Sequence, residues 1–202
     1  MTPLFSTAFF PPIMYVAILL QHKEVLIETQ ETFPKQTYRN RLEIMTANGV
    51  RTLTVPVIRN NHSHTEEVRI DYKERWNIIH LRTLEAAYSA SPYYQYYKDD
   101  LEALLTRRYD SLLELNMATL EWLLKQLKSS CTMNYTTDYL PASGDPQDYR
   151  TLFSPKVPYP SDNLPRYYQV FSDRQPFVPN LSIFDLLMNL GPDAKEYLKK
   201  IM

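Results

Sequence analysis

Residues 3–29 read PLFSTAFFPPIMYVAILLQHKEVLIET, and this stretch decides the fold. Leu4–Phe9 is apolar and favours a buried strand, which the Pro11-Pro12 pair ends before a short helix through Tyr15 to Gln21. Glu24–Thr29 is apolar and β-branched at its centre, which predicts a second strand. Strand, helix and strand at this spacing predict a βαβ unit and therefore a mixed α/β fold of the α+β kind.

The turn after the first strand allows two interpretations. Ligands of open α/β sheets bind beyond the carboxyl ends of the strands, so the turn Phe10-Pro11-Pro12 and the end of Glu24–Thr29 would form one rim of a site. In the second interpretation the two prolines only end the strand.

The apolar N-terminal stretch is not typical of a targeting signal or a membrane span. It has no basic region before it and no small-residue cleavage site, and Pro11 and Pro12 interrupt it in the middle. The run is also too short to cross a bilayer comfortably. We therefore expect a cytoplasmic protein without membrane insertion.

A β-hairpin is predicted further along the chain. Leu42–Thr46 and Val50–Val57 flank Ala47-Asn48-Gly49, and an Asn-Gly pair supplies the positive φ angles that hairpin turns require. Pro56 indicates that the second strand lies at an edge or ends there. Glu67–Asp71 predicts another strand, and we expect the hairpin to extend the sheet of the βαβ unit.

Three helices are predicted in the centre of the chain. They span Lys73–Ala90, Tyr93–Arg108 and Asp110–Lys128. The third helix carries apolar residues at spacings of three and four, which is typical of a stripe that faces the core: Leu113, Met117, Leu120, Leu124 and Leu127.

The last third of the chain is rich in proline, since nine of the fifteen prolines lie between residues 141 and 192. Residues 129–165 lack periodicity and predict an irregular segment. In the arm that follows, Tyr167–Phe171 predicts a strand. A final helix begins at the N-cap Ser182, with Asp185 in a capping position, and ends at Gly191-Pro192.

The length of 202 residues fits one domain over 1–202, with a regular body over 1–128 and an arm, 166–202, that packs back on it. A formal net charge of −1 and a pI near 6.4 give no electrostatic reason to bind nucleic acid. The single cysteine, Cys131, excludes an intramolecular disulfide and a zinc site built on several cysteines. With only three glycines, neither GxGxxG nor a Walker A loop occurs, and no cofactor is predicted.

The densest polar and aromatic stretch is QETFPKQTYRNR at residues 30–41. It offers the cations Lys35, Arg39 and Arg41, with Gln36 and Asn40 as neutral hydrogen-bonding groups between them. If residues 38–44 are extended, both arginines point to one face and form a clamp for a carboxylate or a phosphate. The alternative is a solvated edge whose charges discourage aggregation.

Among the four histidines, His80 is the candidate for chemistry. It lies four residues after Trp76, which places it on an apolar helix face, where it is either a buried structural residue or a general acid or base. His62 and His64 are two residues apart in a loop, and no metal site is predicted.

Several blocks occur together in an order and spacing that resemble the WbqC-like protein family: PLFSTAFFPPIMY, IETQETFPKQTYRNR, LTVPV, RWNIIHLRTLEAAYSASPYYQYY, RYYQVF and FVPNLSIFDLLMNLGP. The resemblance runs from the N-terminus to about residue 194 and implies a connection to bacterial surface-polysaccharide, lipopolysaccharide and O-antigen assembly. It also implies a site at the positions that match the family pattern, Lys35, Arg39, Asn40, Arg41, Trp76 and His80. Many relatives carry aspartates where this chain has Glu28 and Glu31, which leaves a carboxylate function open.

Two hypotheses from different classes follow from this resemblance. The first is a transferase that adds an acyl or aminoacyl group to an activated amino sugar, a small-molecule substrate. Its expected catalytic residues are His80 as general base with Glu31 or Lys35 orienting the acceptor, and its expected binding residues are Gln36, Arg39, Asn40, Arg41, Trp76 and Tyr88. The second is a non-catalytic assembly protein that docks a partner transferase through the cluster YYQYY at 93–97. Nucleotidyl transfer is disfavoured because the turn after the first strand lacks a histidine pair.

Overall fold

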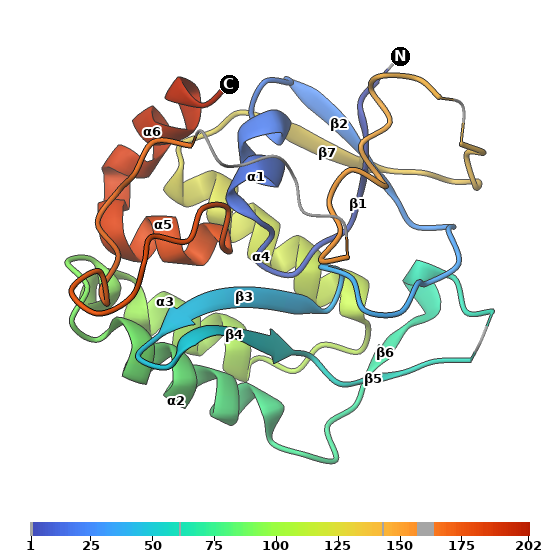
Figure 1. Ribbon diagram of the computed structural model, residues 1–202. Helices are drawn as coiled ribbons and strands as arrows, with labels where there is room; N and C mark the ends of the chain where they lie inside the picture. Colours follow the sequence, from blue (N-terminus) through green and yellow to red (C-terminus); the bar gives the residue numbers. More distant parts are fainter. Residues whose placement is uncertain (1, 61, 143, 157–163) are drawn as a thin grey trace.

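The computed structural model describes residues 2–60, 62–142, 144–156 and 164–202 (Figure 1). Helices and small sheets alternate along the chain, so the predicted mixed α and β class is confirmed. The predicted irregular segment 129–165 extends partly outside the described residues.

The N-terminal βαβ unit is confirmed. β1 (Leu4–Ser6) and β2 (Glu24–Glu28) pair in parallel, and α1 (Ile13–Leu19) connects them with all of its residues buried. β1 is shorter than the predicted strand, because its pairing with β2 ends at Ser6. The chain then bends at Phe10, which has a positive φ of 41°. Pro12 follows this bend as the N-cap residue of α1.

A third strand joins this sheet from the segment that the sequence predicts to be irregular. β7 (Thr132–Tyr135) pairs in parallel with β2, which gives the order β1-β2-β7. Three of its four side chains are exposed, and therefore its sequence shows no apolar alternation. Its backbone pairing with β2 makes it a strand, a tertiary contact that local sequence does not encode.

The hairpin forms at the predicted place but not in the predicted sheet. β3 (Arg41–Thr46) and β4 (Gly49–Thr54) pair as a two-stranded antiparallel sheet of their own, with Gly49 at a φ of +97° in the turn. The prediction that the hairpin extends the parallel sheet is therefore wrong. β3 instead packs against helices, and the chain breaks after β4 before β5 (Val57–Ile58) pairs with β6 (Arg69–Ile70). A short 3-10 turn, Thr65–Glu67, precedes β6.

The three central helices are confirmed with slightly shorter bounds. They are α2 (Trp76–Tyr88), α3 (Tyr94–Thr106) and α4 (Leu112–Gln126). The stripe predicted for the last of them faces the core, with Met117, Leu120, Leu124 and Leu127 buried and Leu113 packed against the same cluster. Ser111 caps α4 by accepting a hydrogen bond from the backbone of Glu114.

The C-terminal arm ends in α5 (Ile183–Leu190), a 3-10 turn over Gly191–Asp193 and α6 (Ala194–Lys200). Ser182 caps α5 as predicted, since its hydroxyl accepts a hydrogen bond from the backbone of Phe184. The predicted strand at Tyr167–Phe171 is wrong, because this segment has no strand partner among the described residues.

The arm is held by side-chain hydrogen bonds and not by backbone pairing with a strand. The carboxylate of Asp185 is fully buried and accepts bonds from the hydroxyls of Tyr88, at 2.7 Å, and Tyr167, at 2.6 Å, and from the amide of Gln169 at 3.1 Å. Asp185 therefore does not act through capping, as its position in α5 suggested. It joins the arm, α5 and α2 in one buried polar cluster.

Candidate functional site

A cavity of about 720 Å³ lies beyond the carboxyl ends of the parallel strands. Its walls come from the segment after β2, residues 30–39, and from residues 139–156, with His64 at one side. The strands bring polar groups here, because β1 ends at Ser6 and β2 ends at Glu28. The cavity thus occupies the place where open α/β sheets bind their ligands.

Glu28 is a fully buried carboxylate beneath this cavity. It accepts hydrogen bonds from the backbone of Gln30, at 2.9 Å, and from the hydroxyl of Thr136, also at 2.9 Å. Its other oxygen accepts from Arg150 Nη1 at 2.9 Å and from the backbone of Leu140 at 3.3 Å. Four donors satisfy the carboxylate, so Glu28 organises the site and has no acceptor capacity left for a ligand.

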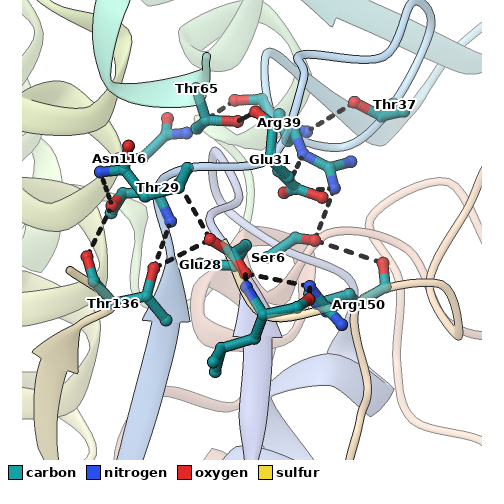
Figure 2. Close-up of polar contacts among 12 residues, drawn as sticks. Ser6, Glu28, Thr29, Glu31, Thr37, Arg39, Thr65, Asn116, Thr136 and Arg150 are labelled. Carbon is teal, nitrogen blue, oxygen red and sulfur yellow. Dashed lines mark hydrogen bonds and ion pairs between the residues drawn. The ribbon is translucent and has the colours of Figure 1, made fainter. Parts of the chain in front are cut away.

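Arg150 bonds to Glu28 at the end of β2 (Figure 2) and also to Asp148. Its Nε and Nη2 donate to the two carboxylate oxygens of Asp148 at 2.9 and 2.6 Å, and its Nη1 also donates to the Leu140 carbonyl. These hydrogen bonds from Arg150 hold the pKa of Asp148 below its usual range. Because Leu4 of β1 exchanges backbone hydrogen bonds with residues 147 and 149, Arg150 is fixed against the sheet.

Glu31 and Arg39 form the ion pair in the cavity wall. Arg39 donates to Glu31 Oε1 from Nη2 at 2.6 Å and from Nε at 2.9 Å, and Nη2 also contacts the hydroxyl of Ser6 (Figure 2). Among the described residues, neither Glu31 Oε2 nor Arg39 Nη1 has a hydrogen-bond partner, and neither atom is sealed from solvent. The pair therefore presents one free acceptor beside one free donor in a partly enclosed cavity.

The remaining lining combines hydroxyl groups with carbon surface. Thr37, Thr151 and Ser154 supply hydroxyls, and Tyr139 and Phe153 supply aromatic rings. Tyr139 is 53% exposed, and the guanidinium of Arg150 stacks over its ring with 5.7 Å between its central carbon and the ring centroid.

Lys156 adds a cation at the edge of the cavity. Its side chain is exposed, and its ammonium makes no ion pair with a described carboxylate. A free ammonium at this position is suited to meet an anionic group on a ligand that reaches out of the cavity.

A small void lies below the cavity floor and shares Arg39, Arg150 and Phe153 with it. Its volume of about 10 Å³ is near the size of one water molecule. Thr7 lines this void, and its buried hydroxyl has no hydrogen-bond partner in the part of the chain that the structure describes. A polar atom of a bound molecule, or a water, would satisfy it.

The structure brings only part of the predicted site together. Glu31 and Arg39 line the cavity, whereas Lys35 and Gln36 are exposed in the preceding turn and do not line it. Asn40 is buried and donates its side-chain amide to the Val55 carbonyl at 2.9 Å, which ties the start of the hairpin to its end.

The predicted clamp of two arginines on one strand face is wrong. Arg39 lies in a turn before the strand, and Arg41 is the first residue of β3, opposite Thr54. The Nε of Arg41 is buried without a partner among the residues that the structure describes, and Arg41 does not line the cavity.

The other predicted positions lie in the core behind the hairpin. Trp76 and His80 are each 3% exposed and pack edge to face at 5.1 Å, with Phe9 beside both. Burial lowers the pKa of His80 to about 4, although a backbone hydrogen bond with Thr54 opposes the shift. His80 is therefore neutral at physiological pH and does not line the cavity. Tyr88, also buried, donates its hydroxyl to Asp185.

Sequence reasoning missed Arg150, Asp148, Tyr139 and Lys156. All four lie in the proline-rich segment that showed no periodicity. Arg150 contacts Glu28 of β2 and Asp148 lies beside Leu4 of β1, so these contacts join residues more than a hundred positions apart. The one available signal was Glu28, a charged residue at the end of a strand whose other central residues are apolar. A charge in that position is buried only when a partner satisfies it.

Two further observations concern the described parts of the chain. No group of three or more His, Cys, Asp or Glu side chains within them is placed to hold a metal ion. No helix within them is both long and apolar enough to cross a membrane.

Comparisons with known proteins match the sequence of this chain to a family. The model of the WbqC-like protein family matches residues 7–154, which include Glu28, Glu31, Arg39 and Arg150. A protein of Mycobacterium tuberculosis (strain ATCC 25618 / H37Rv), described as uncharacterized protein Rv1507c, is 28% identical over 203 residues and covers 87% of each chain. No solved structure matches the chain.

Proposed function

We propose that this chain, which belongs to the WbqC-like protein family, is an enzyme of bacterial surface-polysaccharide assembly that acts on an activated amino sugar. The observation that carries the proposal is the Glu31–Arg39 pair, with its free carboxylate oxygen beside a free guanidinium nitrogen in a cavity of about 720 Å³. A cavity of this size is in the range that binds small molecules.

The lining supports a sugar as the ligand. Sugar hydroxyls donate to a carboxylate and accept from a guanidinium, so Glu31 and Arg39 together recognise neighbouring polar groups of one ring. The rings of Tyr139 and Phe153 offer apolar surface to the C–H face of the same ring. Lys156, at the cavity edge, would pair with the phosphate through which the sugar is activated.

The reaction that we assign to this site is acyl or aminoacyl transfer to the sugar amine. The donor is an activated acyl compound, such as a thioester or an acyl phosphate. The amine nitrogen forms a bond to the acyl carbon, the bond from that carbon to the leaving group breaks, and the nitrogen loses one proton. Glu31 Oε2 accepts that proton, while Arg39 Nη1 stabilises negative charge on the acyl oxygen.

Glu31 takes the position of general base in place of His80. A base must lie within hydrogen-bond reach of the proton that it removes. His80 is buried in the core and does not line the cavity, whereas Glu31 does. The sequence predicted that Glu31 orients the acceptor, and in this proposal Glu31 also removes the proton from the amine.

The alternative of a docking protein receives less support. Its expected surface was YYQYY, but the structure buries Tyr94 and Tyr97 in α3 and leaves Tyr96 75% exposed. A single exposed tyrosine is a common surface feature and does not make an interface.

Mass spectrometry of reaction mixtures tests the proposal. Purified protein is incubated with a UDP-linked amino sugar and a panel of acyl-CoA thioesters, and the acylated sugar is the expected product. The variant Glu31→Gln keeps the size of the side chain but removes its basicity, and we expect a loss of about 10²-fold or more in rate. Glu121→Gln on the exposed face of α4 is the matched control and should retain full activity. A rate in Glu31→Gln equal to that of the control would overturn the assignment of Glu31.

A further inference from the structure

A second hollow lies on the far side of the hairpin, between its turn and α2. It measures about 540 Å³, and none of its lining residues lines the first cavity. The hairpin contributes Asn48 and Arg51, α2 contributes Ile79 and Arg82, and the C-terminal arm contributes Phe171. Three segments that are distant in the sequence therefore meet around one groove.

Two guanidinium groups give this groove its charge. Arg51 and Arg82 are both exposed, and neither forms an ion pair with a carboxylate in the described parts of the chain. No acidic side chain is among the residues that line the groove. In a protein with a net charge of −1, the groove is therefore a local positive site whose two arginines have no ion-pair partner among the described residues.

The rest of the groove is apolar, and a hydrogen bond fixes two of its walls to each other. Ile79, which is 49% exposed, Ala86 and the ring of Phe171 provide carbon surface beside the two arginines. The amide of Gln175 donates to the Ala47 carbonyl at 3.0 Å, which fixes the arm against the hairpin turn. The hydroxyl of Thr46 donates to the Gly49 carbonyl across the hairpin turn, and the hydroxyl of Thr83 donates to the Ile79 carbonyl within α2. The two arginines are therefore the charged donors left for a ligand.

We propose that this groove binds a small organic phosphate, with Arg51 and Arg82 on the phosphate groups and the apolar portion of the molecule against Ile79 and Phe171. Guanidinium groups bind phosphate oxygens in pairs of parallel hydrogen bonds, and two of them match a diphosphate or two neighbouring phosphates. Two cations in one hollow suit a compact ligand better than a nucleic acid, which needs a line of positive charges. This site is independent of the proposed function.

Calorimetry with inorganic pyrophosphate tests the site in the full chain. We expect wild-type protein to bind pyrophosphate, and the variants Arg51→Gln and Arg82→Gln each to weaken binding by about ten-fold or more, since each removes a charge-assisted pair. Both side chains are exposed, so neither change disturbs the core. Arg75→Gln, an exposed arginine just before the same helix and outside the groove, is the matched control and should bind as wild type does.

A second measurement locates the bound ion. Gly49 lies in the hairpin turn between groove residues, so its amide signal in an NMR titration should move with pyrophosphate while those of Gly144 and Gly191 stay in place. Lys156→Gln should leave this titration unchanged, which separates the groove from the first cavity. No binding by wild type, equal weakening in all three arginine variants, or a titration that disappears in Lys156→Gln would each overturn the proposal.

Discussion

The pH dependence of stability should reveal that His80 is a buried, neutral core residue. Burial lowers the pKa of His80 from 6.5 to about 4, so between these values the unfolded chain binds a proton that the folded chain does not. Stability must therefore fall as the pH falls through this window. With one pKa unit worth about 1.4 kcal/mol, His80 should cost about 3 kcal/mol of unfolding free energy between pH 7 and pH 4.

The measurement is urea unfolding at several pH values for wild type and for His80→Gln. Glutamine has a similar size and keeps a neutral donor, but it does not titrate between pH 4 and 7. We expect the two stability curves to converge by about 3 kcal/mol as the pH falls from 7 to 4. His62→Gln, at an exposed position, should run parallel to wild type. Parallel curves for His80→Gln and wild type would refute the burial argument and return His80 to the candidates for catalysis.

Three further predictions concern how the site and the arm are held. Replacing Arg150 by Met should cost about 3 kcal/mol in denaturant unfolding, because Glu28 is then a buried carboxylate without its cation; a cost below 1 kcal/mol would contradict this. Tyr167→Phe should cost about 1–2 kcal/mol through the lost hydrogen bond to buried Asp185, while Tyr168→Phe at a 55% exposed position should cost almost nothing. Gly191→Ala should cost about 1–3 kcal/mol, seen as a lower melting temperature, because its φ is +53° and the new Cβ would clash with the ring of Tyr93; an unchanged melting temperature would show that the turn relaxes freely.

Local pattern was sufficient for the elements whose partners are close in the sequence. The βαβ unit, the Asn-Gly hairpin, the apolar stripe of α4 and the Ser182 cap all follow from periodicity and turn chemistry, and all are present. Each helix, strand, turn or cap among these features depends on residues that are close in the sequence, and periodicity and turn motifs detect such local preferences.

The missed features all depend on contacts between distant parts of the chain. β7 is a strand because it pairs with β2, and Tyr167 is held by Asp185 and not by a ladder. Arg150 reaches the site because residues 147–149 lie beside β1. The sequence around Arg150 does not predict this contact. His80 is a further case: the family resemblance implied a site there, but its helix face turns into the core. Spacing placed it on an apolar face but did not decide between core and pocket.

The central claim is that the Glu31–Arg39 cavity binds an activated amino sugar, and calorimetric titration with UDP-glucosamine tests it most directly. We expect binding by wild type, weakening of about ten-fold or more in Glu31→Gln through loss of the free carboxylate acceptor, and unchanged binding in the exposed control Glu121→Gln. Binding of the same strength in Glu31→Gln and wild type, or no binding to wild type at all, would contradict the claim.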